Sequence, residues 1–274
     1  MPDYCSFSID PLSNSIGALI RGLDLTEGVN GDALVDIRNA WFRHLVLVFE
    51  GQELTPAQQL NFARQLGRVI RYPMVQGLPD YPEIIPVVKL PHETRNFGGV
   101  WHSDTTYLPD PPSATLLLAR ELPPSGGDTQ FANMYLAYDA LSDQTKQVVN
   151  KLTVIQSSAK PRVAKGRSEK VQIGARAGDI ELTAEHPVVR IHPVTGKRAL
   201  YVNPAHSVRF KTMTSVESEP LLNLLFQHQI NPAFTGSYRW KKGAMVLWDN
   251  RCVQHHPLND YHGYKRVMHR ITIA

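Results

Sequence analysis

Short apolar runs separated by turn-forming residues restrict the fold of this chain more than any other feature. Each run is five to seven residues long, too short for a typical helix, and is bounded by Gly, Pro, Asn or Asp. The predicted strands are residues 45–49, 114–119, 187–191, 199–203, 244–248 and 267–273. Twenty prolines and 18 glycines supply the many turns that such a fold needs. An all-helical bundle is therefore disfavoured.

Helices are predicted mainly before the first long run of strands. In residues 32–44 the apolar residues recur at spacings of three and four, as on one buried helical face. Residues 55–66 begin with Thr55 as N-cap and Gln58 completing a capping box. Two further helices are predicted at 142–152 and 218–229. The pattern predicts an α+β protein, mainly β, built on a sandwich or barrel as one domain over residues 1–274.

Charge and cysteine content exclude several classes of protein. The net charge is only +4 and no block of five basic residues exists, so a nucleic-acid partner is not expected. No signal peptide and no run of 18 apolar residues is present, so neither secretion nor a membrane partner is expected. Cys5 and Cys252 form no disulfide framework or zinc motif. We expect a cytoplasmic protein.

The polar segment 157–178 interrupts the pattern of strands. It has few large apolar residues, which is typical of a solvated surface loop. A lid over a binding site is the alternative interpretation.

His102 and Asp104 form a candidate metal-binding pair. If they lie on a strand, residues two apart share a face, so both side chains would reach one ion. The pair alone is weak evidence, because a chain with 11 histidines contains such a pair by chance about as often as not.

A third ligand is sought among the other histidines. His255 follows a predicted strand and the turn Asp249-Asn250, so it would lie at a strand mouth. Its neighbour His256 would point the opposite way, and spacing alone does not choose between the two. Two histidines and one carboxylate form the facial triad that binds non-haem Fe(II) and leaves three positions open.

Two arginines share one face of the final predicted strand. Arg266 and Arg270 alternate with apolar residues, and their Cα atoms would lie about 13 Å apart. An exposed polar face is one interpretation. If the face looks into a barrel instead, each guanidinium needs an acid, and a bound organic acid would supply it.

Taken together, these residues resemble the taurine dioxygenase and 2,4-dichlorophenoxyacetate dioxygenase (TauD/TfdA) group of Fe(II)- and 2-oxoglutarate-dependent dioxygenases. The motifs that carry the resemblance are LVLVFEGQ at 45–52, WHSDTT at 101–106, PPSGGDTQF at 123–131, ALYVN at 199–203, and the segment 248–273. The resemblance implies a double-stranded β-helix, a cupin-like jelly roll with flanking helices.

The resemblance also implies a ligand set. His102, Asp104 and His255 would bind Fe(II), with His256 as a bystander. Thr129 and Arg266 would hold the far carboxylate of 2-oxoglutarate, and Arg270 would meet the acidic group of the prime substrate. Hydroxylation of that substrate with O2 would release succinate and CO2.

Substrate-binding positions depart from the taurine enzymes. Tyr72 stands where those enzymes have a histidine, and Gly98 stands where they have an amide residue, so taurine is not the expected substrate. Tyr107, Thr105 and His206 are predicted to line the pocket. Sulfonates, alkyl sulfate esters, aryloxyalkanoates and small carboxylates all remain open, because Arg270 would pair with any of these anions.

The expected function is thus oxidation of a small organic anion. A cupin-like metal-binding sensor without turnover is the alternative, and a zinc hydrolase is less consistent with two inward arginines. By resemblance only, a homo-oligomer, either a dimer or a tetramer, is expected.

Overall fold

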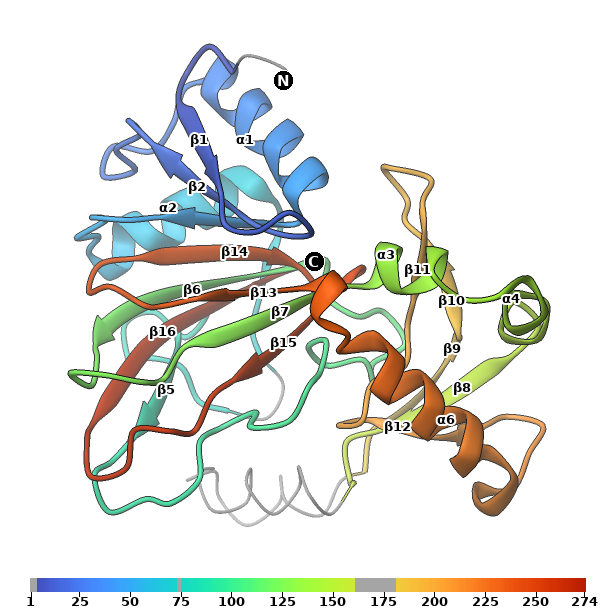
Figure 1. Ribbon diagram of the computed structural model, residues 1–274. Coiled ribbons are helices and arrows are strands. Elements are labelled where there is room, and N and C mark those ends of the chain that lie inside the picture. Colours follow the sequence, from blue (N-terminus) through green and yellow to red (C-terminus); the bar gives the residue numbers. More distant parts are fainter. Residues whose placement is uncertain (1–3, 73–74, 161–180) are drawn as a thin grey trace.

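The computed structural model of the protein describes residues 4–72, 75–160 and 181–274 (Figure 1). Most of the predicted loop or lid at 157–178 therefore lies outside the described residues. No helix among the described residues is both long enough and apolar enough to cross a bilayer.

A large mixed sheet forms the centre of the molecule. Its strand order is β1-β2-β3-β14-β6-β16-β4, and β5 also pairs with β16. The strands are β1 (Ser8–Pro11), β2 (Ala18–Arg21), β3 (Val46–Phe49), β4 (Val69–Ile70), β5 (Ile85–Lys89), β6 (Ala114–Glu121), β14 (Met245–Asp249) and β16 (Arg266–Ile273). All pairings are antiparallel except β2 with β3.

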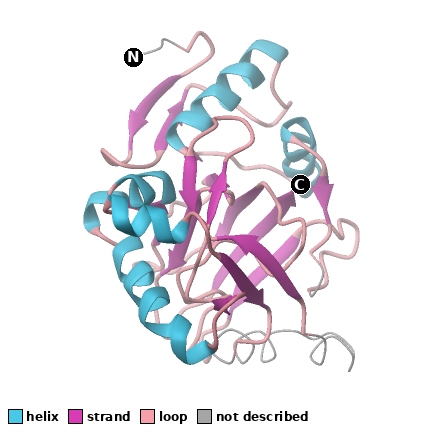
Figure 2. Ribbon diagram, turned by 90° about the vertical axis from the view of Figure 1, so that its right-hand side faces the viewer, coloured by secondary structure: helices cyan, strands magenta, loops and turns pink. Residues whose placement is uncertain are grey.

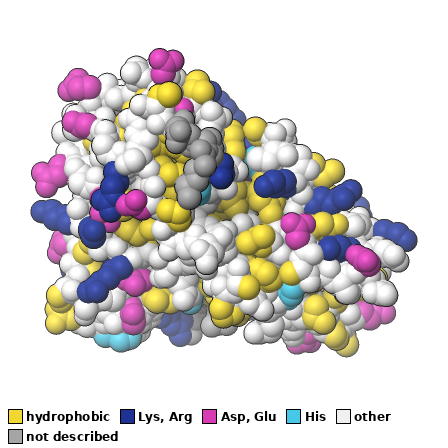
Figure 3. All heavy atoms as spheres, turned by 45° about the horizontal axis from the view of Figure 1, so that its top comes forward, with side chains coloured by type: hydrophobic (Ala, Val, Ile, Leu, Met, Phe, Trp, Pro, Cys, Tyr) yellow, Lys and Arg dark blue, Asp and Glu magenta, His cyan; other side chains and the backbone are white. Residues whose placement is uncertain are grey.

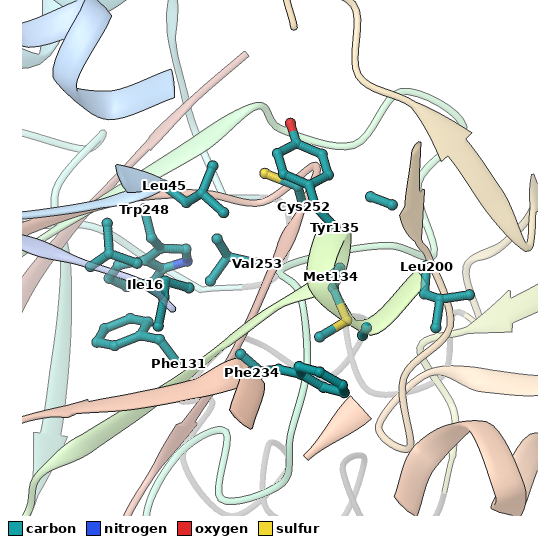
Figure 4. Packing of buried hydrophobic residues seen from close by; sticks show 14 of the residues in the cluster. Ile16, Leu45, Phe131, Met134, Tyr135, Leu200, Phe234, Trp248, Cys252 and Val253 are labelled. Atoms are coloured by element: carbon teal, nitrogen blue, oxygen red, sulfur yellow. The ribbon is translucent and has the colours of Figure 1, made fainter. Parts of the chain in front are cut away.

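A second sheet packs against the first and completes the predicted jelly-roll core (Figures 1 and 2). It contains β13 (Thr235–Tyr238), β7 (Thr129–Asn133) and β15 (Val253–Pro257), in that order. Phe131 of β7 meets Trp248 of β14, with ring centroids 5.9 Å apart. Figure 4 shows this inter-sheet packing around Phe131, Trp248 and Val253.

The central strands bury both faces because their side chains alternate. In β14, Val246 and Trp248 face the second sheet, whereas Met245 and Leu247 join a separate apolar cluster on the other side. Continuous apolar runs such as 45–49 and 244–248 are the sequence signature of this double burial.

Two helices cover the outer face of the large sheet (Figure 1). They are α1 (Gly31–His44) and α2 (Pro56–Leu66), and they contribute Trp41 and Phe62 to the outer cluster. The predicted capping box of Thr55 and Gln58 is present. Helix α1 ends where Leu45 adopts a left-handed conformation, with φ of 67°, so β3 begins one residue later than predicted.

The remaining elements lie beside the second sheet. They are α3 (Met134–Asp139), α4 (Asp143–Val149), α6 (Ser215–Gln229), η1 (Pro232–Phe234), the hairpin of β10 (Val189–Ile191) and β11 (Arg198–Leu200), and a small sheet of β12 (Ser207–Phe210), β8 (Thr153–Ser157) and β9 (Thr183–Pro187). Helix α6 packs on β12, and α3 packs on β11.

Several predicted boundaries are wrong. Helix α6 begins at Ser215 rather than 218, because Thr214 and Glu217 form a capping box, which leaves Pro220 inside the helix. The predicted strand 187–191 is two strands, since Val188 donates its backbone N–H to Leu152 rather than to a sheet partner. The helix predicted at 142–152 ends at Val149. Short polar strands such as β9 and β12 carry no apolar run, so the sequence pattern did not reveal them.

Candidate functional site

Three side chains from two distant segments converge between the two sheets. His102, Asp104 and His255 are buried, and their ligand atoms lie within 4.8 Å of one another. Reciprocal backbone hydrogen bonds of 3.1 and 2.8 Å join His102 to His255 of β15. The convergence therefore depends on the pairing of a loop with a strand.

The predicted reason for the His102 and Asp104 pairing is wrong. These residues do not alternate along a strand: His102 forms a single bridge to β15, and residues 104–107 form a turn. Thr105 within this turn has a φ of +48°, in the left-handed region that non-glycine residues rarely adopt. The turn brings Asp104 back toward His102, so that its Oδ1 lies 3.6 Å from His102 Nε2.

The protonation states suit a divalent metal ion. His102 Nδ1 lies 2.6 Å from the Val100 carbonyl, to which it donates, and this leaves Nε2 with a free lone pair. His255 Nδ1 is buried with no hydrogen-bond partner among the described residues. Burial lowers the pKa of both histidines, so both are neutral. Although burial opposes ionisation of Asp104, the Arg270 guanidinium and a hydrogen bond from Thr115 hold its pKa well below the usual value. Neutral imidazoles and a carboxylate are the donors that a metal requires.

His256 occupies a different environment from His255. It is less buried, and its ring lies 5.4 Å from the Trp101 ring, outside the three-residue cluster. Strand alternation separates the two neighbours as predicted.

Both strand arginines face inward. Arg266 and Arg270 are each 6% exposed, so the prediction that their shared face looks into the barrel is confirmed. Arg270 nevertheless has a protein acid beside it, since its Nη2 lies 3.2 Å from Asp104 Oδ2. No local pattern predicts this pairing, because the turn that places Asp104 depends on an unusual backbone conformation at Thr105.

Arg266 and Thr129 line one cavity that reaches the metal-binding cluster. This cavity also includes Leu117, Trp248 and His255. Trp240 Nε1 donates to Thr129 Oγ1 at 2.9 Å, so the hydroxyl proton of Thr129 remains available for a ligand.

The Arg266 guanidinium is held with part of its hydrogen-bonding capacity unused. Its Nη2 lies 3.4 Å from the Gly127 carbonyl oxygen, whereas its Nε has no hydrogen-bond partner among the described residues. Burial lowers the pKa of Arg266 from its usual value. An anion in this cavity would compensate the desolvated charge.

A second cavity lies on the other side of the cluster. It encloses about 560 Å³, including its open mouth, and Gly98, His102 and Arg270 line both cavities. The Arg270 guanidinium lies over the Tyr72 ring at 4.8 Å, and Tyr72 Oη is 3.1 Å from Tyr107 Oη. The cavity is therefore polar at one wall.

The other predicted pocket residues also line this second cavity. Thr105 Oγ1 is buried without a hydrogen-bond partner among the described residues, and the His206 ring lies 6.2 Å from that of His102. Gly98 has a φ of +72°, and a Cβ atom there would lie 2.9 Å from His102 Cε1. An amide side chain at position 98 would therefore displace His102.

A second cluster of metal-binding residue types has the opposite character. His192, Asp249 and Cys252 are buried together. His192 Nδ1 accepts from the backbone N–H groups of Val194 and Thr195, so its proton is on Nε2, which donates to Asp249 at 3.0 Å. No ring nitrogen is left for a metal ion.

Asp249 and Cys252, the other two members of this second cluster, are also unavailable to a metal ion. The Asp249 carboxylate accepts from Arg251 Nε at 2.8 Å and from Arg251 Nη2. Burial raises the pKa of the Cys252 thiol, which Figure 4 shows beside Tyr135. We interpret this cluster as a structural lock on the turn after β14.

Sequence reasoning missed several residues that surround the site. Thr115 donates to Asp104 at 2.6 Å, and Asn250 donates to Thr115 at 2.9 Å. Residues 249–250 were recognised only as a turn, and a single threonine inside an apolar strand carries no signal of its own. Trp240, which orients Thr129, lies 111 residues from it along the chain.

Comparison with known proteins identifies close relatives over the full chain. The model of the "Taurine catabolism dioxygenase TauD, TfdA family" matches residues 8–272. The chain is 31% identical to an "Alpha-ketoglutarate-dependent sulfate ester dioxygenase" of Pseudomonas putida, over 100% of this chain and 91% of that protein. It is also 31% identical to an "(S)-phenoxypropionate/alpha-ketoglutarate-dioxygenase" of Sphingobium herbicidovorans, over 98% of this chain and 95% of that one.

A solved structure extends the comparison to three dimensions. The crystal structure of AAD-2 in complex with Mn(II) and N-oxalylglycine superposes with a TM-score of 0.84 at 27% identity, over 98% of both chains.

The lock interpretation predicts that Asp249→Asn will destabilise the protein. Removing the carboxylate charge leaves the Arg251 side chain, which is only 15% exposed, without its anionic partner, so we expect the free energy of unfolding to fall by about 3–5 kcal/mol in denaturant titrations. Asp10→Asn is the matched control, because Asp10 pairs with Arg21 where both side chains are 56% exposed, and we expect no measurable loss there. Equal losses in the two variants would contradict the interpretation.

Proposed function

The chain belongs to the TauD/TfdA family of 2-oxoglutarate-dependent dioxygenases, and from this premise we propose that its prime substrate is a small organic anion without a positive charge. Sulfate esters and aryloxyalkanoates are the two classes that fit best. The observation that carries this proposal is the set of polar groups around the second cavity.

Those polar groups are mainly hydrogen-bond donors. Arg270 contributes a guanidinium and Thr105 a buried hydroxyl, and the hydroxyl groups of Tyr72 and Tyr107 lie 3.1 Å apart in the same wall. Among the described lining residues, Asp104 is the only carboxylate, and it is committed to the metal-binding cluster. Sulfate and carboxylate oxygens would accept these donors, whereas the ammonium group of taurine would lie near Arg270 without an acidic partner.

We propose that His102, Asp104 and His255 hold Fe(II) at the junction of the two cavities. Their neutral and anionic states, and the free nitrogen of His102, fit that ion. When bound, iron and 2-oxoglutarate supply oxidative decarboxylation of the co-substrate coupled to hydroxylation of a substrate C–H bond by O2. The protein itself binds and orients the reactants and excludes water.

Arg266 and Thr129 are proposed to bind the far carboxylate of 2-oxoglutarate. A bidentate contact to Arg266 and a hydrogen bond from Thr129 would fix the co-substrate in the first cavity, whose other end reaches His255. Arg270 would bind the substrate anion from the second cavity, while Tyr72, Thr105, Tyr107 and His206 shape that cavity.

We further propose one domain over residues 1–274, a cytoplasmic location and assembly into a dimer or tetramer. A single family match over residues 8–272 supports the first. Two free cysteines are consistent with a reducing compartment.

The proposed assembly has apolar surface available to it. Ile191 and Val194, which are 65% and 58% exposed, offer apolar surface for a contact between copies. Figure 3 shows a face on which Lys, Arg, Asp and Glu side chains are scattered among apolar ones.

Succinate release across a substrate panel tests the proposed substrate class. With Fe(II), ascorbate and O2 present, we expect an alkyl sulfate or an aryloxyalkanoate to give a kcat/KM at least about 10-fold above that of taurine, because an unpaired ammonium is costly to bury. A preference for taurine would refute the substrate proposal, and no succinate with any compound would favour a metal-binding protein without turnover.

The neighbouring histidines provide a test of the metal ligands. We expect His255→Ala to weaken Co(II) binding by more than about 100-fold, since losing a direct ligand exceeds the 10–100-fold typical of an outer-shell partner. His256→Ala should retain the affinity, because His256 lies outside the cluster. Calorimetric titration of the metal-free protein measures both, and the reverse ranking would contradict the assignment.

Arg266→Ala tests the co-substrate site. We expect 2-oxoglutarate affinity to fall by about 2–5 kcal/mol, or roughly 30-fold to several thousand-fold, because a buried carboxylate loses its cation. Quenching of Trp240 and Trp248 fluorescence in the Mn(II)-loaded protein reports binding without turnover. Affinity for 2-oxopentanoate, which lacks the far carboxylate, should change less than about threefold. Similar losses for both acids would show that Arg266 does not bind the far carboxylate of 2-oxoglutarate.

A further inference from the structure

We infer that Thr115, oriented by Asn250 and Trp248, holds Asp104 so that only one of its two carboxylate oxygens is offered to the metal. Thr115 and Asn250 are thus positioning residues that keep three coordination positions open. This inference rests on the metal site proposed above.

The four residues form a buried chain of hydrogen bonds with a defined direction. Trp248 Nε1 donates to Asn250 Oδ1 at 2.9 Å, which fixes the orientation of that amide. Asn250 Nδ2, a group that only donates, then donates to Thr115 Oγ1 at 2.9 Å. Thr115 therefore accepts from the amide, and its single proton is directed to Asp104 Oδ2 at 2.6 Å. The chain starts at an indole N–H that cannot accept, so its direction cannot reverse.

This direction makes the two oxygens of Asp104 unequal. Oδ2 accepts from Thr115 and also lies 3.2 Å from Arg270 Nη2, whereas Oδ1 lies 3.6 Å from His102 Nε2. A carboxylate ligand can bind a metal through one or both oxygens. With Oδ2 engaged elsewhere, only Oδ1 is available, and two histidines with one oxygen leave three of six positions open. A chelating 2-oxo acid and O2 together need all three.

Thr115 has a role that Arg270 cannot fill. Arg270 is also the cation proposed for the substrate anion, so its contact with Asp104 has a competitor whenever substrate is bound. Thr115 belongs to β6, in the middle of the large sheet, and is fully buried. Its hydrogen bond to Oδ2 is therefore independent of what occupies the second cavity.

The turn that carries Asn250 is rigidly held. Asn250 donates its backbone N–H to Ser113 at 2.9 Å, and Asp249 donates its own to Leu45 at 3.1 Å. The side chain of Asp249 is committed to His192 and Arg251. The cluster of His192, Asp249 and Arg251 thus fixes the turn, and Asn250, the residue after Asp249, orients Thr115.

Thr115→Val is the direct test, because it keeps the shape of the side chain and removes the hydroxyl. We expect Co(II) affinity to fall by about 10–100-fold. We also expect the visible spectrum of the Co(II) protein to change toward a higher coordination number, as Oδ2 becomes free to bind. Thr115→Ser restores the hydroxyl and should return both the affinity and the spectrum to those of the unchanged protein.

Thr272→Val is the matched control. Thr272 lies directly opposite Thr115 in the β6–β16 pairing, is equally buried, and its hydroxyl has no hydrogen-bond partner among the described residues. The same substitution there should leave the Co(II) affinity and spectrum unchanged. If circular dichroism shows that Thr115→Val does not fold, Thr115→Ala is measured instead, because alanine removes the hydroxyl without placing a methyl group in its position.

The outcomes separate this inference from the metal site on which it rests. If the unchanged protein binds Co(II) and His255→Ala abolishes binding, but removal of the Thr115 hydroxyl changes neither affinity nor spectrum, the positioning role is refuted. An equal loss in Thr272→Val, or no recovery in Thr115→Ser, would also refute it. If the unchanged protein does not bind Co(II), the proposed metal site itself is wrong.

Discussion

The buried charge of Asp104 is the constraint on which the rest of the site depends. A carboxylate that is almost fully removed from water costs several kcal/mol unless it is paired and hydrogen-bonded. Here Arg270 supplies a cation and Thr115 a hydrogen bond, both at Oδ2. Oδ1 is left facing two neutral histidines, a set of donors that could hold a divalent metal ion. The arrangement of the side chains around Asp104 thus follows from the need to stabilise one buried carboxylate.

Two desolvated guanidiniums, those of Arg266 and Arg270, lie in the interior of the jelly roll. Arg266 and Arg270 project from alternate positions of β16 into the space between the sheets, where apolar side chains such as Met268 are the rule. Arg270 has Asp104 nearby, but the Arg266 Nε has no hydrogen-bond partner within the described part of the chain. A fold with two desolvated guanidiniums favours anionic ligands, and His102 and Arg270 line both cavities. A dianionic co-substrate and an anionic substrate would satisfy both charges.

Two buried clusters that each contain a histidine and an aspartate have different hydrogen-bonding patterns in this protein. In one, His102 donates Nδ1–H to a backbone carbonyl and keeps Nε2 free. In the other, His192 accepts two backbone N–H groups at Nδ1 and donates from Nε2, so neither nitrogen is available. For the histidines, the difference lies in the hydrogen bonds made by the second ring nitrogen, and in the second cluster Arg251 also occupies Asp249. The inert cluster still contributes, because it holds the turn that carries Asn250.

Local chemistry in the sequence determined a large part of this protein. Apolar runs predicted the central strands, the capping box at Thr55 predicted α2, and period-two alternation predicted that Arg266 and Arg270 share one face. These features depend on neighbouring residues, so a linear pattern contains them. The family motifs implied that His102 and His255 meet, but tertiary structure alone decided the turn at Asp104, the acid beside Arg270 and the path from Trp248 to Thr115. Each of these contacts joins segments far apart in the sequence or depends on an unusual backbone conformation, and no local pattern encodes either.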